Sequence, residues 1–318
     1  MLSTLQALIH VSTAYANCNR TEVDEVLYAP PAKPQQIIDA VEWMDEAMVN
    51  DITPKLVGDR PNTYTYTKAL AESLLSEECK NLPVAIVRPS IVTASWREPV
   101  RGWVDNINGP TGLVLAVGKG IMRTMLYDSN AVADLIPVDT VINLMITAAW
   151  NTGTKPSNEI MIYNCTSGQL NSITWGDIER IAFPILLRYP SLEVLRYPGG
   201  SFKQSRLLND VATIFQHLIP AYIFDAFCGL VGRKKMCVHR NVNCRNVTYF
   251  FLSRSASIRM VRIVEKLHKA LTALEWFTTR QWHFKCNNVL MLSNELKGKD
   301  KEVSFSSLMC NSHVNGWP

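Results

Sequence analysis

PNTYTYTKALAE, residues 61–72, is the stretch of sequence that decides the fold. Tyr64 and Lys68 are four residues apart, so in a helix both side chains lie on one face. The residues that follow predict a helix over 67–81, because apolar side chains recur at helical spacing: Leu70, Leu74, Leu75 and Cys79. A phenol near an ammonium group is more acidic than a free phenol and donates a proton at neutral pH. Tyr66 is out of register with Lys68 and is expected to pack or to face a substrate.

The spacing alone does not decide between a catalytic pair and an ordinary surface pair. The chain contains 10 tyrosines, so one Tyr-x-x-x-Lys spacing arises easily by accident. The segments on either side of the helix therefore carry the argument.

Apolar strands are predicted before and after this helix. QALIHVS, residues 6–12, runs into Ser12 and Thr13, and PVAIVRP, residues 83–89, ends in Arg-Pro. In a parallel sheet, ligands bind at the carboxyl ends of the strands, where a hydroxyl can hydrogen-bond to a substrate carbonyl. The alternatives are a turn closed by Ser or Thr after the first strand and a proline that terminates the second.

Strand and helix signals continue to alternate downstream. DTVINLMITAAW, residues 139–150, predicts a helix with Asp139 as its N-cap, and IMIYNCT, residues 160–166, predicts another buried strand. Continuous apolar strands that alternate with helices indicate a doubly wound parallel sheet with both faces covered. We therefore predict an α/β domain over residues 1–172.

Residues 173–236 change character and are predicted to be helical. Thr174 is the expected N-cap of the first helix, with Asp177 at the capping-box position. Further along, residues 211–231 are apolar and are followed by the basic run GRKK at 232–235.

Two interpretations of residues 211–231 stay open. The segment is long enough to span a bilayer, but it contains polar residues and a proline: Gln216, His217, Pro220 and Asp225. It is either a buried or interfacial helix pair broken at Pro220, or a membrane span or re-entrant anchor with GRKK on the cytosolic side.

Composition excludes several classes of protein. Hydrophobic residues make up 47% of the chain and charged residues 19%, which argues against general disorder. The net charge of +4 and the absence of a long basic run do not suggest a nucleic-acid partner. The 8 cysteines are scattered, so we expect reduced thiols in a cytosolic setting. No metal site is predicted, because Cys237, His239 and Cys244 lack a fourth ligand and paired spacing.

The order of the motifs is more specific than any one of them. A strand ending in Ser-Thr, a Tyr-x-x-x-Lys helix about 50 residues later and a strand ending in Arg-Pro about 20 residues further on resemble the extended short-chain dehydrogenases. Within that group the chain resembles the fatty acyl-CoA reductases. The likeness covers roughly residues 5–236 and 260–290 and rests on VSTAYAN (11–17), YTYTKALAE (64–72), VRPSIV (87–92), GWVDNINGPTG (102–112), LIPVDTVIN (135–143) and LHKALTALEWFTTRQWHF (267–284).

The resemblance implies a Rossmann-like domain that binds NADPH, followed by a helical C-terminal domain over residues 260–318. It implies reduction of a long-chain acyl-CoA to a primary alcohol, with Tyr64 as general acid. Lys68 would hold the nicotinamide ribose and tune Tyr64. Thr13, favoured over Ser12, would orient the carbonyl. The residues expected to contact the cofactor are Tyr64, Lys68, Arg88, Pro89 and Ser90.

The resemblance also implies membrane association, at the endoplasmic reticulum or the peroxisome, with the catalytic side in the cytosol. The oligomeric state and the acyl chain length stay open. Two other readings are possible: a non-catalytic membrane-associated fragment, or another extended short-chain dehydrogenase such as a sterol dehydrogenase or a sugar epimerase, although the oily C-terminal half disfavours sugars.

The chain departs from the family pattern in three places. No strand followed by a GxxGxxG turn precedes Ser12, so we expect an N-terminally truncated Rossmann-like domain without its phosphate loop. Residues 237–259 have no clear periodicity and look like an insertion. The tail, SLMCNSHVNGWP, drifts out of the pattern. These departures predict an inactive or partial product more than a different ancestry.

Overall fold

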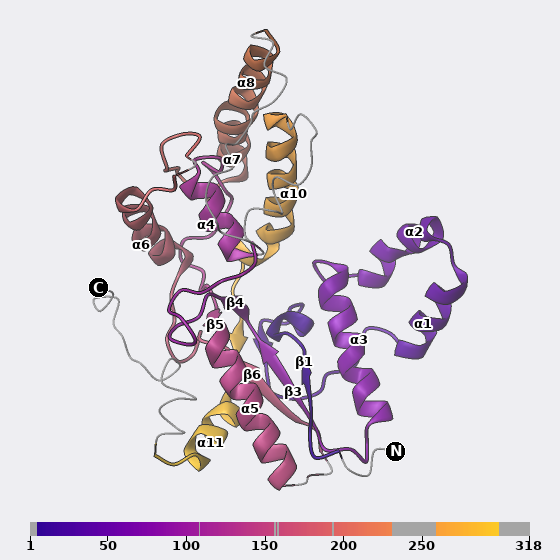
Figure 1. Ribbon diagram of the computed structural model, residues 1–318. Helices are drawn as coiled ribbons and strands as arrows, with labels where there is room; N and C mark the ends of the chain where they lie inside the picture. The colour runs from indigo at the N-terminus through magenta and orange to yellow at the C-terminus, as the bar shows by residue number, and fades with distance from the viewer. Residues whose placement is uncertain are drawn as a thin grey trace. The chain divides into compact units, whose positions relative to one another are not determined.

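The computed structural model describes residues 5–107, 109–155, 157, 159–192, 194–230 and 259–298 (Figure 1). The predicted insertion at 237–259, save its last residue, the basic run at 232–235, the cysteines and histidine considered for a metal and the tail after residue 298 lie outside these residues.

The chain forms two compact units. The first comprises residues 1–103, 134–172 and 282–318, and the second comprises residues 104–133 and 173–281. The chain therefore passes between the units four times, once at the boundary expected after residue 172.

The first unit is built on a three-stranded parallel sheet. Its strands are β1 (Leu8–Val11), β3 (Val84–Pro89) and β6 (Met161–Cys165), in the order β1-β3-β6. Leu8 pairs with Val84, and Ala85 pairs with Met161. Two short parallel pairs complete the strands of this unit: β2 (Glu22–Val23) with β7 (His283–Phe284), and β4 (Ile91–Thr93) with β5 (Leu135–Pro137).

The central strand shows why the sheet is covered on both faces. Every residue of β3 is buried, and successive side chains point to opposite faces. Ala85 and Val87 pack in a core with α5 (Val138–Thr154) and α11 (Asn287–Glu295). Arg88 points the other way and meets α3 (Thr63–Glu78). Figure 1 shows the strands between α3 and α5. The predicted doubly wound α/β fold is confirmed.

The remaining helices of the first unit are short. The 3-10 turn η1 (Ala14–Asn17) follows β1, and α1 (Pro34–Trp43) and α2 (Glu46–Val57) lie between β2 and α3. All three strands predicted in this unit are present within one or two residues of their expected bounds. The Tyr-x-x-x-Lys helix begins earlier than its apolar spacing indicated, because Asn62 caps it by accepting from the Thr65 amide at 3.0 Å.

Asp139 does not cap its helix, contrary to the prediction. Helix α5 begins at Val138 after Pro137, which places Asp139 inside the first turn. Its carboxylate accepts instead from three backbone amides of the loop after β4, those of Trp96, Arg97 and Glu98, at 2.8–3.2 Å. The side chain thus caps a loop that is distant in sequence.

The second unit is helical in its described residues. Its helices are α4 (Pro110–Gly118), α6 (Trp175–Arg188), α7 (Arg206–Thr213), α8 (Ile219–Leu230) and α10 (Met260–Thr278). The predicted capping box of Thr174 and Asp177 is present at the start of α6, with Thr174 accepting from the Asp177 amide at 3.1 Å.

The break at Pro220, which belonged to one of the two interpretations of residues 211–231, is absent. A π-helical turn, η2 (Ile214–Leu218), joins α7 directly to α8, and the three run as one helix of 25 residues over Arg206–Leu230. The wider turn changes the backbone pairing just before Pro220, which has no amide hydrogen to contribute. The helix is also largely exposed: only 17% of its most apolar stretch is buried.

Candidate active site

The predicted site residues of the first unit follow the carboxyl ends of two adjacent strands. Ser12 and Thr13 come directly after β1, and Ser90 comes directly after β3. The Ser12 amide donates to the Val87 carbonyl at 2.8 Å, which extends the β1–β3 ladder past the end of β1. Because parallel strands end at the same edge of a sheet, these hydroxyls gather on one side of the unit.

Tyr64 and Lys68 lie on one face of α3, as their spacing predicted. The Lys68 Nζ lies 6.0 Å from the centroid of the Tyr64 ring. It also donates to the Val11 carbonyl at 2.9 Å, at the last residue of β1. The ammonium group is therefore held beside Ser12, while Tyr64 is 53% exposed and open to a ligand.

Tyr66 has a different environment from Tyr64. It is 4% exposed, and its hydroxyl has no hydrogen-bond partner among the described residues. Burial raises the pKa of the Tyr66 phenol, and the positive charge of Arg60 lowers it in part. Of the two alternatives for this residue, packing inside the protein is the one that the structure has.

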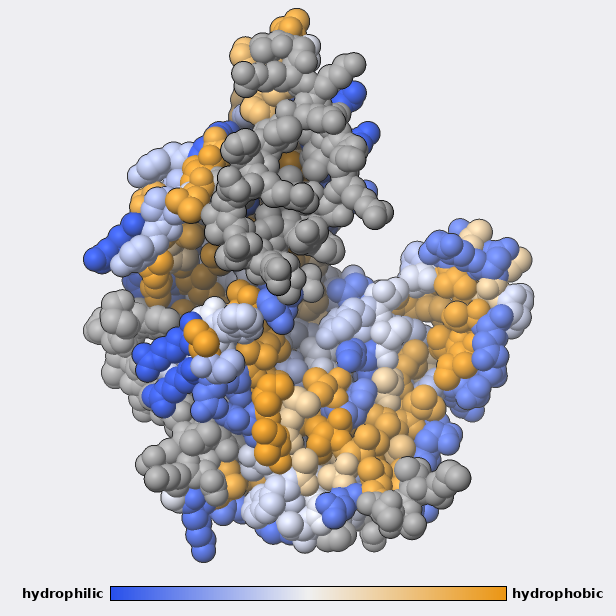
Figure 2. Space-filling model, in the orientation of Figure 1, coloured by the Kyte–Doolittle hydropathy of each residue, from blue (hydrophilic) through white to orange (hydrophobic). Residues whose placement is uncertain are grey.

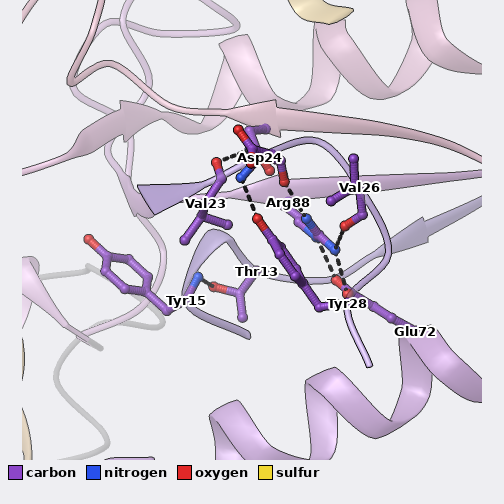
Figure 3. Close-up of polar contacts among 9 residues, drawn as sticks. Thr13, Tyr15, Val23, Asp24, Val26, Tyr28, Glu72 and Arg88 are labelled. Atoms are coloured by element: carbon purple, nitrogen blue, oxygen red, sulfur yellow. Dashed lines mark hydrogen bonds and ion pairs between the residues drawn. The ribbon is translucent and has the colours of Figure 1, made fainter. Parts of the chain in front are cut away.

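Thr13 is buried and loosely held by two long contacts. Its hydroxyl accepts from the Tyr15 amide at 3.3 Å, which caps η1 (Figure 3). The same hydroxyl donates to the Pro89 carbonyl at 3.4 Å. The Ser12 hydroxyl is also buried and has no partner among the described residues. Two hydroxyls with weak or absent protein partners thus lie at the end of β1, which suits contact with a ligand carbonyl.

His10 lies on β1 below the same face of α3. Burial lowers the pKa of its imidazole, the Lys68 ammonium lowers it further, and the Glu72 carboxylate raises it in part. Burial and the Lys68 charge therefore both favour the neutral form of His10.

Arg88 is placed differently from an exposed cofactor contact. It is fully buried, and its guanidinium donates to both Glu72 oxygens at 2.8 Å (Figure 3). It also donates to the carbonyls of Asp24 at 3.1 Å and Val26 at 2.9 Å. Its side chain points inward to α3 and to the loop after β2, whereas Pro89 and Ser90 continue the strand toward the site.

Comparison with known proteins identifies the ancestry of this arrangement. Two family models described as "Male sterility protein" match residues 1–145 and 216–311, the first of them an NAD-binding domain. The chain is 45% identical over 302 residues to fatty acyl-CoA reductase 1 of Mus musculus and of Homo sapiens, which covers 95% of this chain. It is 42% identical over 299 residues, or 94% of the chain, to fatty acyl-CoA reductase 2 of Mus musculus.

The chain belongs to the fatty acyl-CoA reductase family. It spans about half the length of these curated relatives, 54% in each case. A solved structure, the terminal R domain from the myxalamid PKS-NRPS biosynthetic pathway, resembles it with a TM-score of 0.42 and 14% identity over 96% of this chain and 58% of that one.

The residues of this reductase-family chain fit one end of a nicotinamide cofactor. The exposed Tyr64 hydroxyl, the Lys68 ammonium and the unpartnered Ser12 hydroxyl suit a ribose and a carboxamide. The pyrophosphate end finds no glycine-rich turn after β1, because β1 passes directly into η1 through STAYAN, without a glycine. Gly118 and Gly120 belong to the second unit, at and after the end of α4, and do not supply such a turn after a strand.

Sequence reasoning missed two carboxylates of the site. Glu72 lies one turn after Lys68, a signal that was present in the quoted helix. Asp134 precedes β5, and its carboxylate accepts from the amides of Ser167 at 2.8 Å and Gly168 at 3.0 Å, which ties the end of β6 to the segment after β3. Burial raises the pKa of Asp134, and these donors oppose the rise. The only sequence signal for Asp134 was an acidic residue in the middle of the apolar stretch AVADLIPV, residues 131–138.

Proposed function

We propose that this protein reduces long-chain fatty acyl-CoA to a primary fatty alcohol with NADPH. The observation that carries the proposal is the Tyr64–Lys68 pair on one face of α3, whose lysine donates to the Val11 carbonyl next to Ser12. The relatives supply the reaction class, since they are named fatty acyl-CoA reductases. Two two-electron reductions convert the thioester to an alcohol and release CoA.

Each residue has a role that its position supports. NADPH, when bound, supplies the hydride for each reduction. Tyr64 donates a proton to the carbonyl oxygen as negative charge develops there, and Thr13 orients that oxygen with its weakly held hydroxyl. Lys68 holds the nicotinamide ribose, and its charge stabilises the phenolate that Tyr64 becomes. Ser12 is a second donor at the same edge.

The residues after β3 complete the proposed cofactor contacts. Pro89 and Ser90 lie at the carboxyl end of the strand, where a nicotinamide ring is expected in a doubly wound sheet. The Arg88 guanidinium is fully buried, so in this proposal it does not contact the cofactor directly. It supports the site by holding Glu72 and the loop after β2.

The test is NADPH oxidation with palmitoyl-CoA in mild detergent, with the product identified by mass. We expect a primary alcohol, and we expect Tyr64→Phe to lower kcat by at least about 100-fold, the scale of a lost general acid. Tyr66→Phe is the matched control, because it removes a buried hydroxyl without a partner from the same helix. Undiminished turnover by Tyr64→Phe would reject the assignment.

The phosphate-binding segment requires its own arm of the experiment. Turnover is measured for the 318-residue chain and for a chimera that joins a strand and glycine-rich phosphate-binding turn to residue 1. Activity of the chimera alone assigns reduction to the site and phosphate binding to the added segment. If neither protein is active, the proposal fails.

We also propose that α7, η2 and α8 attach the protein to a membrane surface. Large apolar side chains are exposed along the helix, among them Phe215 at 65% and Phe227 at 63%. Figure 2 shows hydrophobic residues at the end of α8. By length and composition the helix could also cross a bilayer.

Polar anchors on the inner face of this helix favour surface attachment over crossing. His217 accepts from the Arg123 amide at 2.8 Å, and Asp225 accepts from the amides of Met260 at 2.7 Å and Val261 at 3.1 Å at the start of α10. One side of the helix is thus committed to its own unit, and the other is free to enter the lipid interface.

Liposome flotation tests the attachment. Phe215→Ser combined with Phe227→Ser should abolish flotation, whereas Trp43→Ser, which removes a comparably exposed aromatic from α1, should not. Equal flotation of wild type and double variant would contradict the proposal. Following the family resemblance, we assign the membrane to the endoplasmic reticulum or the peroxisome, with the catalytic side cytosolic, and protease protection in isolated organelles distinguishes the sides.

A further inference from the structure

The buried charge of Arg88 is unusual for its position. The four preceding residues of β3 are apolar and buried, and an apolar residue would continue the strand without the cost of desolvating a charge. A buried ion pair contributes little net stability compared with apolar packing, and its best attested use is to fix one arrangement among several. The structure around Arg88 indicates which arrangement is fixed.

Tyr64, Lys68 and Glu72 recur at intervals of four along α3, so they share one face of the helix. Lys68 donates to the Val11 carbonyl of β1, and Glu72 receives two parallel hydrogen bonds from Arg88 of β3. The helix is therefore anchored at two points, one turn apart, to two neighbouring strands. Two anchors fix both the rotation of α3 and its position along its axis, whereas one would leave it free to pivot.

The same strand end also positions the opposite side of the site. Arg88 directly precedes Pro89, whose carbonyl accepts the Thr13 hydroxyl at 3.4 Å. Tyr64 is thus linked to Arg88 through the helix, and Thr13 is linked to it through the next residue of the strand. The distance between the two groups proposed to contact the substrate carbonyl therefore depends on this junction as well as on the Lys68 contact with β1.

The loop after β2 closes the junction from a third direction. The Nη1 and Nη2 atoms of Arg88 donate to the carbonyls of Asp24 and Val26, and the Tyr28 hydroxyl accepts from the Asp24 amide at 2.7 Å. Figure 3 shows these groups converging on the guanidinium opposite Glu72. The planar, multiply bonded guanidinium is held in one orientation, which a lysine could not reproduce.

We propose that Arg88 and Glu72 form a clamp that positions Tyr64 and Lys68 against Thr13 for reduction. Neither residue contacts the substrate in this proposal, so both are positioning residues. The inference rests on the proposed function, because it concerns the same site. A misplacement of about 1 Å lowers the rate by about 100-fold in well-oriented sites, so a loosened clamp should lower kcat far more than it changes KM.

The experiment compares Glu72→Gln, Arg88→Lys and the apolar pair Arg88→Met with Glu72→Leu, in a protein that shows turnover as wild type. We expect kcat to fall 10- to 100-fold for each, with KM for acyl-CoA within threefold. Glu72→Asp, which keeps the charge, should recover part of the loss. Glu295→Gln, which breaks the exposed pair with Lys155 in the same unit, is the control and should leave kcat unchanged.

The double apolar variant keeps the proposal falsifiable, because it leaves no unpaired buried charge and is expected to fold even where the single variants do not. If it folds and retains the wild-type kcat, the ion pair is only structural and the proposal is overturned. A reduced kcat with unchanged KM supports the clamp.

Hydrogen exchange separates this proposal from the proposed function. Faster exchange of the amides in the first two turns of α3 in Glu72→Gln, but not in Glu295→Gln, reports a loosened helix without any turnover. If wild type shows no reduction but the exchange rates rise as expected, the proposed function fails, while the anchoring of α3 by Arg88 and Glu72 stands. Unchanged exchange together with unchanged kcat sinks the clamp alone.

Discussion

Replacing Thr13 by valine separates its proposed role in the reaction from its role in the fold. Valine has nearly the same shape as threonine, with a methyl group in place of the hydroxyl. The two hydrogen bonds that it removes are 3.3 and 3.4 Å long, longer than the roughly 2.9 Å of a typical bond. The loss of a threonine cap costs about 1 kcal/mol in typical helices, and these long contacts place η1 at or below that value.

The expected loss of activity is much larger. A hydrogen-bond donor aimed at a developing oxyanion is worth about 100- to 1000-fold in kcat, or about 3–4 kcal/mol. A loss of about 1 kcal/mol of stability leaves a domain of ordinary stability almost fully folded, so it does not explain a 100-fold decrease.

The assay measures kcat for palmitoyl-CoA and the urea midpoint of the same preparations. Thr13→Ser should retain most of the activity, because it keeps the hydroxyl. Ser12→Ala is the neighbouring comparison, since the Ser12 hydroxyl has no protein partner and its loss should not destabilise the fold. If Thr13→Val keeps kcat within threefold of wild type while Ser12→Ala loses 100-fold, the assignment of the two hydroxyls is reversed. If neither changes kcat, the oxyanion reasoning fails.

Three further outcomes test the contacts that hold the fold. Asp139→Ala should cost about 2–4 kcal/mol in urea unfolding, because it strips a charged acceptor from three loop amides, and Asp39→Ala, which loses one exposed contact, should cost under about 0.5; equal costs would refute the loop-capping role. Burial raises the pKa of Glu25 to about 7, although hydrogen bonds from the Asn288 and Asn164 amides oppose the rise, so the contribution of Glu25 to the free energy of unfolding is complete below about pH 4.5 and is lost as the pH rises through 7. Glu25→Gln should flatten this pH dependence by at most about 1.4 kcal/mol per pH unit, as measured by urea unfolding midpoints from pH 5 to 8. Thr174→Ala should lower the stability of the helical unit by about 1 kcal/mol through loss of its capping box, and an unchanged melting curve would contradict this.

The sheet and most of the candidate site could be predicted from the sequence because their signals are local. Buried parallel strands are continuous apolar runs, and Ser12, Thr13 and Ser90 stand directly after them. The Tyr64–Lys68 spacing has one geometric consequence in a helix, and the structure has it. Each of these inferences needs only a segment of about a dozen residues.

The contacts that could not be predicted join residues far apart in the chain. Glu72 meets Arg88 across 16 residues of sequence, and Asp139 reaches amides 41–43 residues away. In both cases the local pattern has a simpler reading: a solvated charge on a helix and an N-cap. A helix break at Pro220 was expected in one interpretation and is absent, because the π-helical turn before Pro220 accommodates the proline.

The Arg88–Glu72 contact has a consequence for anyone who redesigns the protein. The helix that carries Tyr64 cannot be treated as an interchangeable part, because its electrostatic counterpart lies on a strand. A helix transplanted without Arg88 would bring a buried carboxylate into an apolar sheet, and a strand transplanted without Glu72 would bring an equally isolated cation. Helix α3 and strand β3 must therefore be exchanged together, because a tolerated change at Glu72 or at Arg88 requires a matching change at the other residue.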